Sequence, residues 1–335
     1  MASSFTTAGA ETMSECIDKK YQALQNRHGI AVAVVDYDKT QFLFYGQAHK
    51  DQIFEIGSLT KTFTATLLAE EVIHRKIKLT DPIPAEYQKP GNQITYKHLT
   101  THTSGIVSGN FPGYMGSNPE SPYEGLSVSL FKELYRSTPL ASPVGTKWNY
   151  SNIGTGVLGL VLSENNETNY SEMVKNRIFK VLGMTESYFE VPDSKLPNFP
   201  EGNVNGESWS HWDLFNTGIN PAGGIRSTIS DMAIFARANL VPFRTSLGSP
   251  IELAQEPLYG ITDSMWIGMN WLIEPKKNLI WHNGSTMGFE SILAISTKYS
   301  IAVVALTDTG IFTADSGGNV SQDNTLQDVV FGCMN

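Results

Sequence analysis

The sequence predicts an α/β fold of the α+β type, with one antiparallel sheet flanked by helices from the two chain ends. Strand patterns occur near both ends of the chain, and helical patterns fill its middle. This distribution places residues 11–80 and 255–335 in one discontinuous sheet domain and residues 81–254 in an inserted, mainly helical domain. A cleft between the two domains is the expected place for a site.

The composition is that of a packed globular protein. Of 335 residues, 41% are hydrophobic and 17% are charged, which does not fit a disordered chain. The formal net charge of -9 disfavours nucleic acid and anionic membranes as partners. No apolar run approaches the roughly 20 residues that a membrane-spanning helix needs.

The first elements predict a helix followed by a hairpin. Residues 11–27 have the pattern of an amphipathic helix, and Gly29 can end it in the left-handed conformation. The apolar run 30–35 predicts a well-buried strand, and residues 41–45 predict its hairpin partner.

The middle of the chain is helical and rich in turns, and strand patterns return after it. Residues 59–75 carry apolar side chains at helical spacing, whereas 76–128 and 190–224 are rich in proline and glycine and predict loops. Further helices are predicted at 129–136, 153–164, 170–182, 229–240 and 321–331. Further strands are predicted at 265–273, 279–282, 289–296 and 301–307.

Ser58 and Lys61 stand three residues apart at the start of a predicted helix. This spacing puts them on one helix face, where the lysine could accept the serine proton if burial or nearby positive charge lowered its pKa. The helix N-terminus would also stabilise an oxyanion. Taken alone, the spacing favours ordinary helix capping by Ser58 with a solvated lysine, because such a pair often occurs by chance.

Six segments in order resemble the serine β-lactamases and penicillin-recognising enzymes. The run 54–64 (FEIGSLTKTFT) is similar to their active-site segment, most of all in the class C β-lactamase and D-alanyl-D-alanine carboxypeptidase branch. The other similar segments are 78–82 (KLTDP), 98–105 (HLTTHTSG), 143–152 (PVGTKWNYSN), 223–233 (GGIRSTISDMA) and 282–284 (HNG). The resemblance implies the β-lactamase/transpeptidase-like fold, with a five-stranded antiparallel sheet.

The resemblance also implies roles for individual residues. Ser58 is the nucleophile that is acylated, and Lys61 and Tyr150 share the general-base work. Which of these two takes the serine proton stays open. Tyr150 returns the proton to the leaving group. Asn152 is expected to point its amide into the cleft and hold Lys61 or a substrate carbonyl.

The opposite wall of the cleft is implied to be His282, Asn283 and Gly284, with the backbone N–H groups of Ser58 and Ser285 as the oxyanion hole. Three further positions carry weaker expectations. Asn110 falls where class C enzymes place a cleft glutamine, so it is expected to contact the substrate amide. His102 is expected to be structural, and Trp212 either lines the pocket or covers the core.

Position 282 departs from the lactamase pattern, which has lysine there. A histidine with an unperturbed pKa near 6.5 is only partly charged at neutral pH and binds a carboxylate less well. We therefore favour a D-amino-acid-directed peptidase or amidase, similar to D-Ala-D-Ala carboxypeptidases. A class C-like β-lactamase, a carboxylesterase and a penicillin-binding sensor with little turnover are the alternatives. No cofactor or metal is expected, the substrate is a small molecule or peptide, and the oligomeric state stays open.

The two cysteines, Cys16 and Cys333, lie near opposite ends of the chain. Without a fold they fit two unrelated buried thiols. The resemblance places the terminal helices side by side and so implies a disulfide, which would indicate an oxidising compartment, periplasmic or secreted in a bacterium. The first twelve residues lack the basic start and apolar core of a signal peptide, so we expect the leader to be absent from this chain.

Overall fold

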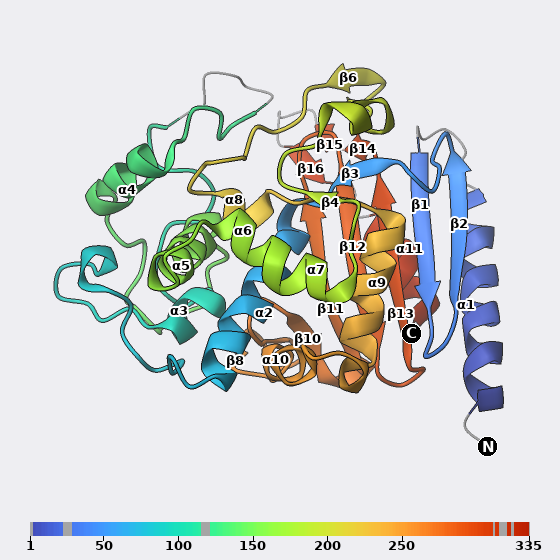
Figure 1. Ribbon diagram of the computed structural model, residues 1–335, viewed down its shortest axis with the longest axis horizontal. Helices are drawn as coiled ribbons and strands as arrows, with labels where there is room; N and C mark the ends of the chain where they lie inside the picture. The colour runs from blue at the N-terminus through green and yellow to red at the C-terminus, as the bar shows by residue number, and fades with distance from the viewer. Residues whose placement is uncertain are drawn as a thin grey trace.

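The structure, a computed structural model, describes residues 3–22, 29–114, 121–310, 312–314, 320–322 and 325–334. Its main feature is an antiparallel sheet with helices on both faces and a further group of helices beside it (Figure 1). In sheet order the strands are β2 (Thr40–Gly46), β1 (Gly29–Val35), β13 (Ile301–Thr307), β12 (Glu290–Ser296), β11 (Leu279–Ser285), β10 (Leu272–Glu274), β9 (Trp266–Ile267) and β8 (Tyr259–Gly260).

The predicted fold class is confirmed, but the sheet has eight strands rather than five. Five of them have seven residues each, and three short strands extend the sheet beyond β11. The pattern at 265–273 predicted a single strand. Asn270, with a φ of 57°, takes the left-handed conformation between β9 and β10, so the chain turns there and makes two strands.

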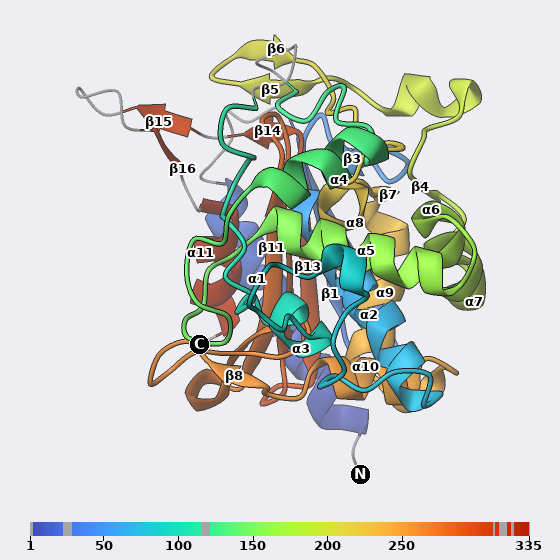
Figure 2. The same cartoon turned by 90° about the vertical axis from the view of Figure 1, so that its left-hand side faces the viewer.

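The central strands β1, β12 and β13 are buried on both faces, which explains their continuous apolar runs. Alternate residues of β1 point to opposite faces. Ile30, Val32 and Val34 pack toward α1 (Ser3–Gln22) and α11 (Thr325–Met334), which lie side by side in Figure 2. Their neighbours Ala31, Ala33 and Val35 join the larger core on the other face.

The opposite face is covered by α9 (Ile229–Leu240), which packs on β13 and β1. This helix matches its predicted bounds. It lies on the sheet although its residues fall inside the range 81–254, and the division into domains at these boundaries stays a prediction.

The first helix starts earlier than predicted. It begins at Ser3 rather than at residue 11, and residues 23–27 of the prediction lie outside the described part. Its buried side chains Met13, Ile17 and Tyr21 recur every four residues, so one face of the helix packs on the sheet.

The helical group beside the sheet starts from α2 (Thr60–Ile73), which packs on α10 (Gly248–Ala254), α8 (Asn220–Gly223) and α5 (Asn152–Asn165). Its other helices are α3 (Tyr96–Thr100), α4 (Val128–Ser137), α6 (Tyr170–Val174) and α7 (Lys180–Leu182). A π-helical turn at Lys175–Phe179 joins α6 to α7, so the helix predicted at 170–182 is continuous in the chain but not uniformly α-helical.

The smaller sheets were not predicted from the sequence. The predicted loop 190–224 contains β5 (Gly202–Val204) and β6 (Glu207–Trp209), and β5 pairs in parallel with β14 (Thr309–Gly310). These strands have two or three residues, and they form because a distant segment supplies their hydrogen bonds. In another small sheet, β7 (Arg226–Thr228) lies between β3 (Ile53–Glu55) and β4 (Ser187–Tyr188) and pairs with both. In a third, β15 (Phe312–Ala314) pairs with β16 (Val320–Gln322).

The two chain ends are joined by a disulfide between Cys16 of α1 and Cys333 of α11, whose Cα atoms are 5.9 Å apart. The bond follows from the side-by-side packing of the two helices. Substituting Cys16→Ser is expected to lower the free energy of unfolding by about 2–5 kcal/mol, because the bond closes a loop of 317 residues. Denaturant unfolding of this variant and of the wild type with and without reductant measures the change. Two free thiols in the folded, oxidised protein would contradict the assignment.

None of the helices in the described ranges combines the length and hydropathy that a membrane-spanning helix requires.

Candidate active site

Ser58 lies in a 3-10 turn, Gly57–Leu59, that leads directly into α2. Pairing of β3 with β7 fixes this turn from one side, because Glu55 is opposite Arg226 and the Arg226 guanidinium contacts the Glu55 carboxylate. Lys61 follows in the first turn of the helix. Its Nζ lies 2.9 Å from Ser58 Oγ and 2.7 Å from the carbonyl oxygen of Ala222. The predicted pair is therefore in direct contact.

Lys61 is fully buried, and the two hydrogen-bond partners of its Nζ, Ser58 Oγ and the Ala222 carbonyl oxygen, are uncharged. Burial lowers the pKa of the Lys61 amine well below its usual value, because no carboxylate compensates the charged form. A neutral amine can donate one hydrogen to the Ala222 carbonyl and present its lone pair to the Ser58 hydroxyl. The pair is then arranged for proton transfer from oxygen to nitrogen.

Tyr150 lies over this pair, with Lys61 Nζ 4.9 Å from the centre of its ring. The next residue, Ser151, caps α5 by accepting a hydrogen bond from Gly154 N, and its own backbone N–H donates to His102 Nδ1. This cap fixes the direction of the chain at Tyr150. Burial raises the pKa of the Tyr150 phenol, and a hydrogen bond with Ser58 opposes the rise.

The opposite wall is formed by β11, which packs against the Ser58 turn without intervening side chains. A Cβ atom on Gly284 would lie 2.0 Å from the Ile56 carbonyl oxygen and 2.8 Å from Ser58 N. A Cβ atom on Gly57, whose φ is +49°, would lie 2.8 Å from Ser285 N. Two glycines thus bring the backbone N–H groups of Ser58 and Ser285 close together, as an oxyanion hole requires.

Gly284→Ala is expected to disrupt this wall, since the added methyl group meets backbone rather than a flexible side chain. We expect a loss of about 1–3 kcal/mol in stability. We also expect at least a roughly 100-fold loss in kcat/KM, because the two N–H groups separate. Thermal unfolding and kinetics measure both. Gly260→Ala is the matched control, because its nearest neighbours are 3.7 Å away. Equal activity in the two variants would contradict the assignment.

His282 is buried beside Tyr150, with 6.3 Å between the ring centres. Burial and, secondarily, the nearby Lys61 lower the pKa of His282 to about 3, although its hydrogen bond to the Asn283 carbonyl raises it. Its Nδ1 lies 2.6 Å from that carbonyl oxygen, so Nδ1 carries the hydrogen and Nε2 is an acceptor. The imidazole is thus neutral at physiological pH.

The substrate contacts predicted for Asn152 and Asn110 stay predictions, and the structure shows the surroundings of both side chains. Asn152 Nδ2 donates to the hydroxyl of Tyr123 at 3.0 Å, and within the described residues its Oδ1 has no hydrogen-bond partner and is buried. The amide therefore does not hold Lys61. Asn110 is half-buried in its loop, and no hydrogen bond within the described residues joins it to Ser58, Lys61 or Tyr150.

Several residues near the predicted site residues were not predicted from the sequence as part of the site, or were predicted to be only structural. Ala222 contributes its carbonyl oxygen, and Tyr123 holds Asn152. The Trp212 ring packs edge-on against Tyr123, which places it beside the site rather than only over the core. The His102 ring lies 4.6 Å from that of Tyr150. Gln327 of α11 accepts a hydrogen bond from Asn283 Nδ2 at 3.2 Å.

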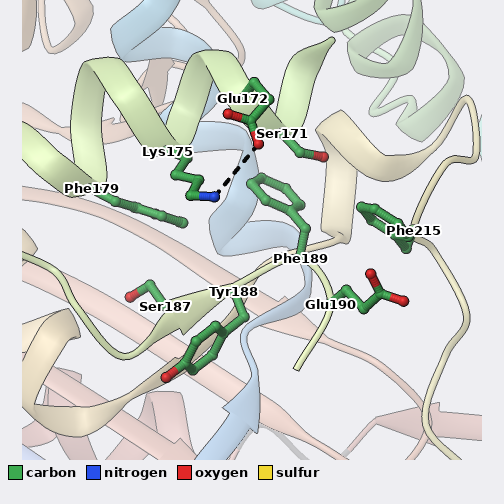
Figure 3. A pocket seen from close by; sticks show the side chains of 9 residues that line it. All are labelled: Ser171, Glu172, Lys175, Phe179, Ser187, Tyr188, Phe189, Glu190 and Phe215. Atoms are coloured by element: carbon green, nitrogen blue, oxygen red, sulfur yellow. Dashed lines mark ion pairs between the residues drawn. The ribbon is translucent and has the colours of Figure 1, made fainter. Parts of the chain in front are cut away.

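A separate cavity of about 210 Å³ lies between α6, the π-helical turn and β4 (Figure 3). In Figure 3, Lys175 reaches toward Glu172, and the rings of Phe179 and Phe189 line the same cavity. No residue of the Ser58 cluster lines this cavity, and the Ser187 hydroxyl on its wall is bonded to Asp231. It is also smaller than ordinary ligand pockets, which begin at about 300 Å³. This cavity therefore offers no competing nucleophile to Ser58.

Known proteins are similar to this chain over most of its length. The family model described as Beta-lactamase matches residues 17–319. A protein named Beta-lactamase from Escherichia coli (strain K12) is 28% identical over 294 residues, which cover 81% of this chain and 73% of that protein. Proteins of the same name from Pseudomonas fluorescens and Lysobacter lactamgenus are 26% and 25% identical, covering 79% and 83% of this chain and 76% and 72% of their own lengths. The chain belongs to the β-lactamase family of serine hydrolases, as its motifs predicted.

Proposed function

We propose that the protein is a serine hydrolase that forms an acyl-enzyme at Ser58 and acts as a peptidase or amidase on D-amino-acid substrates. The observation that carries this proposal is the buried Lys61 amine, which lies 2.9 Å from Ser58 Oγ and has a lowered pKa. An amine in this state is a competent base for a serine hydroxyl at neutral pH.

Acylation begins when neutral Lys61 takes the Ser58 proton and the Ser58 oxygen attacks the substrate carbonyl. The carbonyl oxygen becomes an oxyanion between the N–H groups of Ser58 and Ser285. Each such donor typically stabilises the transition state by about 3–4 kcal/mol. Burial favours the protonated phenol of Tyr150, which supports Lys61 rather than Tyr150 as the base of this step.

Collapse of the intermediate then requires a proton on the leaving group. Tyr150 is hydrogen-bonded with Ser58, so its phenol can donate that proton and be reprotonated by the Lys61 ammonium. Attack of water on the acyl-enzyme uses the same groups in reverse order and releases the acid. Ser58, Lys61 and Tyr150 thus return to their starting protonation states.

The second candidate is β-lactam hydrolysis, which the names of the relatives favour. The neutral His282 argues against it in this chain, since a lysine at that position in the lactamase pattern supplies a permanent positive charge. An esterase and a penicillin-binding sensor with little turnover use the same residues and differ in the substrate and in the deacylation rate.

A substrate panel tests the proposal. Purified protein is incubated with N-acyl-D-alanyl-D-alanine peptides, D-amino-acid amides, p-nitrophenyl esters and a fluorescent penicillin, with Ser58→Ala as the control. We expect Ser58-dependent turnover of amides or peptides to exceed that of the penicillin. Turnover of the penicillin alone would make the second candidate correct. Equal behaviour of the wild type and Ser58→Ala on every substrate would rule out the nucleophile.

The disulfide supports a location in an oxidising compartment, either the periplasm or the cell exterior. Retention of the Cys16–Cys333 bond in protein extracted under thiol-blocking conditions would support this location.

A further inference from the structure

The cavity between α6, the π-helical turn and β4 is walled by phenylalanine rings from three separate segments (Figure 3). Phe179 belongs to the π-helical turn, Phe189 directly follows β4, and Phe215 lies in the loop before α8. The first two are buried, and Phe215 is half-buried. The volume of about 210 Å³ is below that of pockets for drug-sized ligands, but above the roughly 150 Å³ of an apolar cavity that binds benzene. The space therefore fits one small organic molecule.

Contacts outside the cavity hold two of these rings in place. The Phe179 ring packs edge-on against Phe63 of α2 and stacks against Phe189, with 6.1 Å between the ring centres. The Phe189 ring packs edge-on against Tyr170, and its carbonyl oxygen accepts a hydrogen bond from the Arg226 guanidinium. Because these walls are already formed, a ligand does not have to order them on binding.

The cavity has one carboxylate without a charged partner. Glu172 is paired with Lys175 at 3.6 Å, and both residues line the cavity. Glu190 also lines it and is exposed, and no ion pair or hydrogen bond joins its side chain to another of the described residues. The lining thus contains two carboxylates and one ammonium group, which leaves a net negative charge beside the aromatic rings.

Aromatic faces next to an unpaired carboxylate favour an organic cation. The face of a phenyl ring carries negative electrostatic potential and attracts an ammonium group within about 6 Å. The cation–π contacts among the described residues are made with tyrosine rings, so the three phenylalanine rings hold no lysine or arginine. A neutral ligand would leave Glu190 unpaired. An anion would meet Glu190 as a like charge and compete with Glu172 for Lys175.

We propose that this cavity is a binding site for a small organic cation, in which an ammonium group is attached to a single aromatic ring or to short alkyl groups. The apolar part of the ligand packs against Phe179, Phe189 and Phe215, and the ammonium group faces Glu190. No residue of the Ser58 cluster lines the cavity, so this binding is independent of the chemistry at Ser58.

Three probes of similar size test the charge preference. Benzylammonium, benzyl alcohol and phenylacetate share a benzyl group and differ in the charge of the end group at neutral pH. In NMR titrations of the wild type we expect benzylammonium to bind with a Kd of about 1 mM or below. We expect benzyl alcohol to bind at least about fivefold more weakly, and phenylacetate more weakly still. Equal Kd values, tightest binding of phenylacetate, or no binding of benzylammonium below about 10 mM would each overturn the proposal.

Glu190→Gln makes the test specific to the cavity. The variant keeps the size of the side chain and removes its charge, and we expect it to weaken benzylammonium by about threefold to tenfold without changing the Kd of benzyl alcohol. Glu133→Gln is the matched control, because Glu133 is exposed on α4 and does not line the cavity. An unchanged ratio of the two Kd values in Glu190→Gln, or an equal change in Glu133→Gln, would contradict the role of Glu190.

A second variant locates the apolar part of the ligand. Phe215→Ala removes one aromatic wall from a half-buried loop position, and we expect it to weaken both benzylammonium and benzyl alcohol by at least about threefold. Thermal unfolding checks that the variant is folded, and the wild-type and Glu190→Gln titrations stand without it. Unchanged Kd values in folded Phe215→Ala would place the benzyl group outside this cavity and overturn the proposal.

Discussion

Replacing Ser58 with alanine is expected to lower kcat/KM by at least about 10⁴-fold on every substrate that the wild type turns over. The change removes the atom that forms the acyl bond. The alanine keeps the backbone N–H of the oxyanion hole and leaves Lys61 bonded to the Ala222 carbonyl. Substrate binding and thermal stability should therefore change little. Steady-state kinetics together with thermal unfolding separate loss of chemistry from loss of fold.

Ser285→Ala is the matched control for this variant. The backbone of Ser285 lies against Gly57 at the same site, its expected contribution is a backbone N–H, and its hydroxyl donates to the Thr286 carbonyl. We expect its kcat/KM to stay within about tenfold of the wild type. Comparable losses in the two variants would mean that either hydroxyl supports the reaction equally, which contradicts Ser58 as the nucleophile.

Lys61→Met is expected to lower kcat/KM by about 10²- to 10⁴-fold, which is the range for loss of a general base. Methionine keeps the length and apolar character of the side chain but cannot accept a proton. Lys61→Arg is the discriminating control, because arginine keeps a positive charge and never deprotonates in proteins. If Lys61 acted only through its charge, the arginine variant would retain activity. We expect both variants to show this loss.

The same lysine should make rate and stability depend on pH. The pKa of Lys61 in the folded protein lies well below the unfolded value of about 10.4. The pH at which kcat/KM declines on the acid side is therefore expected to lie below about 10.4 as well. Between the two pKa values the unfolded chain binds more protons than the folded chain, and stability therefore rises with pH.

Lys61→Met removes the destabilisation that comes from burying an amine whose charged form is unfavourable in the folded protein. The variant is expected to be more stable than the wild type by about 1–2 kcal/mol at neutral pH. The difference should shrink as the pH approaches 10.4, the unfolded pKa. Denaturant unfolding at several pH values measures it. A variant less stable than the wild type at neutral pH would indicate a charged lysine in the folded protein.

Most of the long elements could be predicted from the sequence because burial on two faces or on one helix stripe leaves a periodic signal. Helix α9 was predicted at its observed bounds, and β13 likewise. The short strands β5 and β14 could not be predicted, because their pairing depends on residues about 100 positions apart in the chain. The break between β9 and β10 was missed because it depends on the conformation of Asn270.

Those residues of the candidate site that belong to short sequence motifs could be predicted from the sequence. Ser58, Lys61, Tyr150 and Gly284 come together as the motif order implied. Contacts between unrelated segments carried no such signal. Gln327 is 44 residues from Asn283, and Tyr123 is 29 residues from Asn152, so only the folded chain brings these pairs together. The low pKa of His282 likewise depends on burial that a sequence does not record.

The most direct test of the central claim is the mass of the protein trapped during turnover. Acid quenching with a slowly hydrolysed ester or β-lactam, followed by peptide mapping, locates any covalent adduct. We expect one acyl group per chain, on the peptide that contains Ser58, and none in Ser58→Ala. An adduct on another residue, or one that persists in Ser58→Ala, would contradict acyl transfer at Ser58.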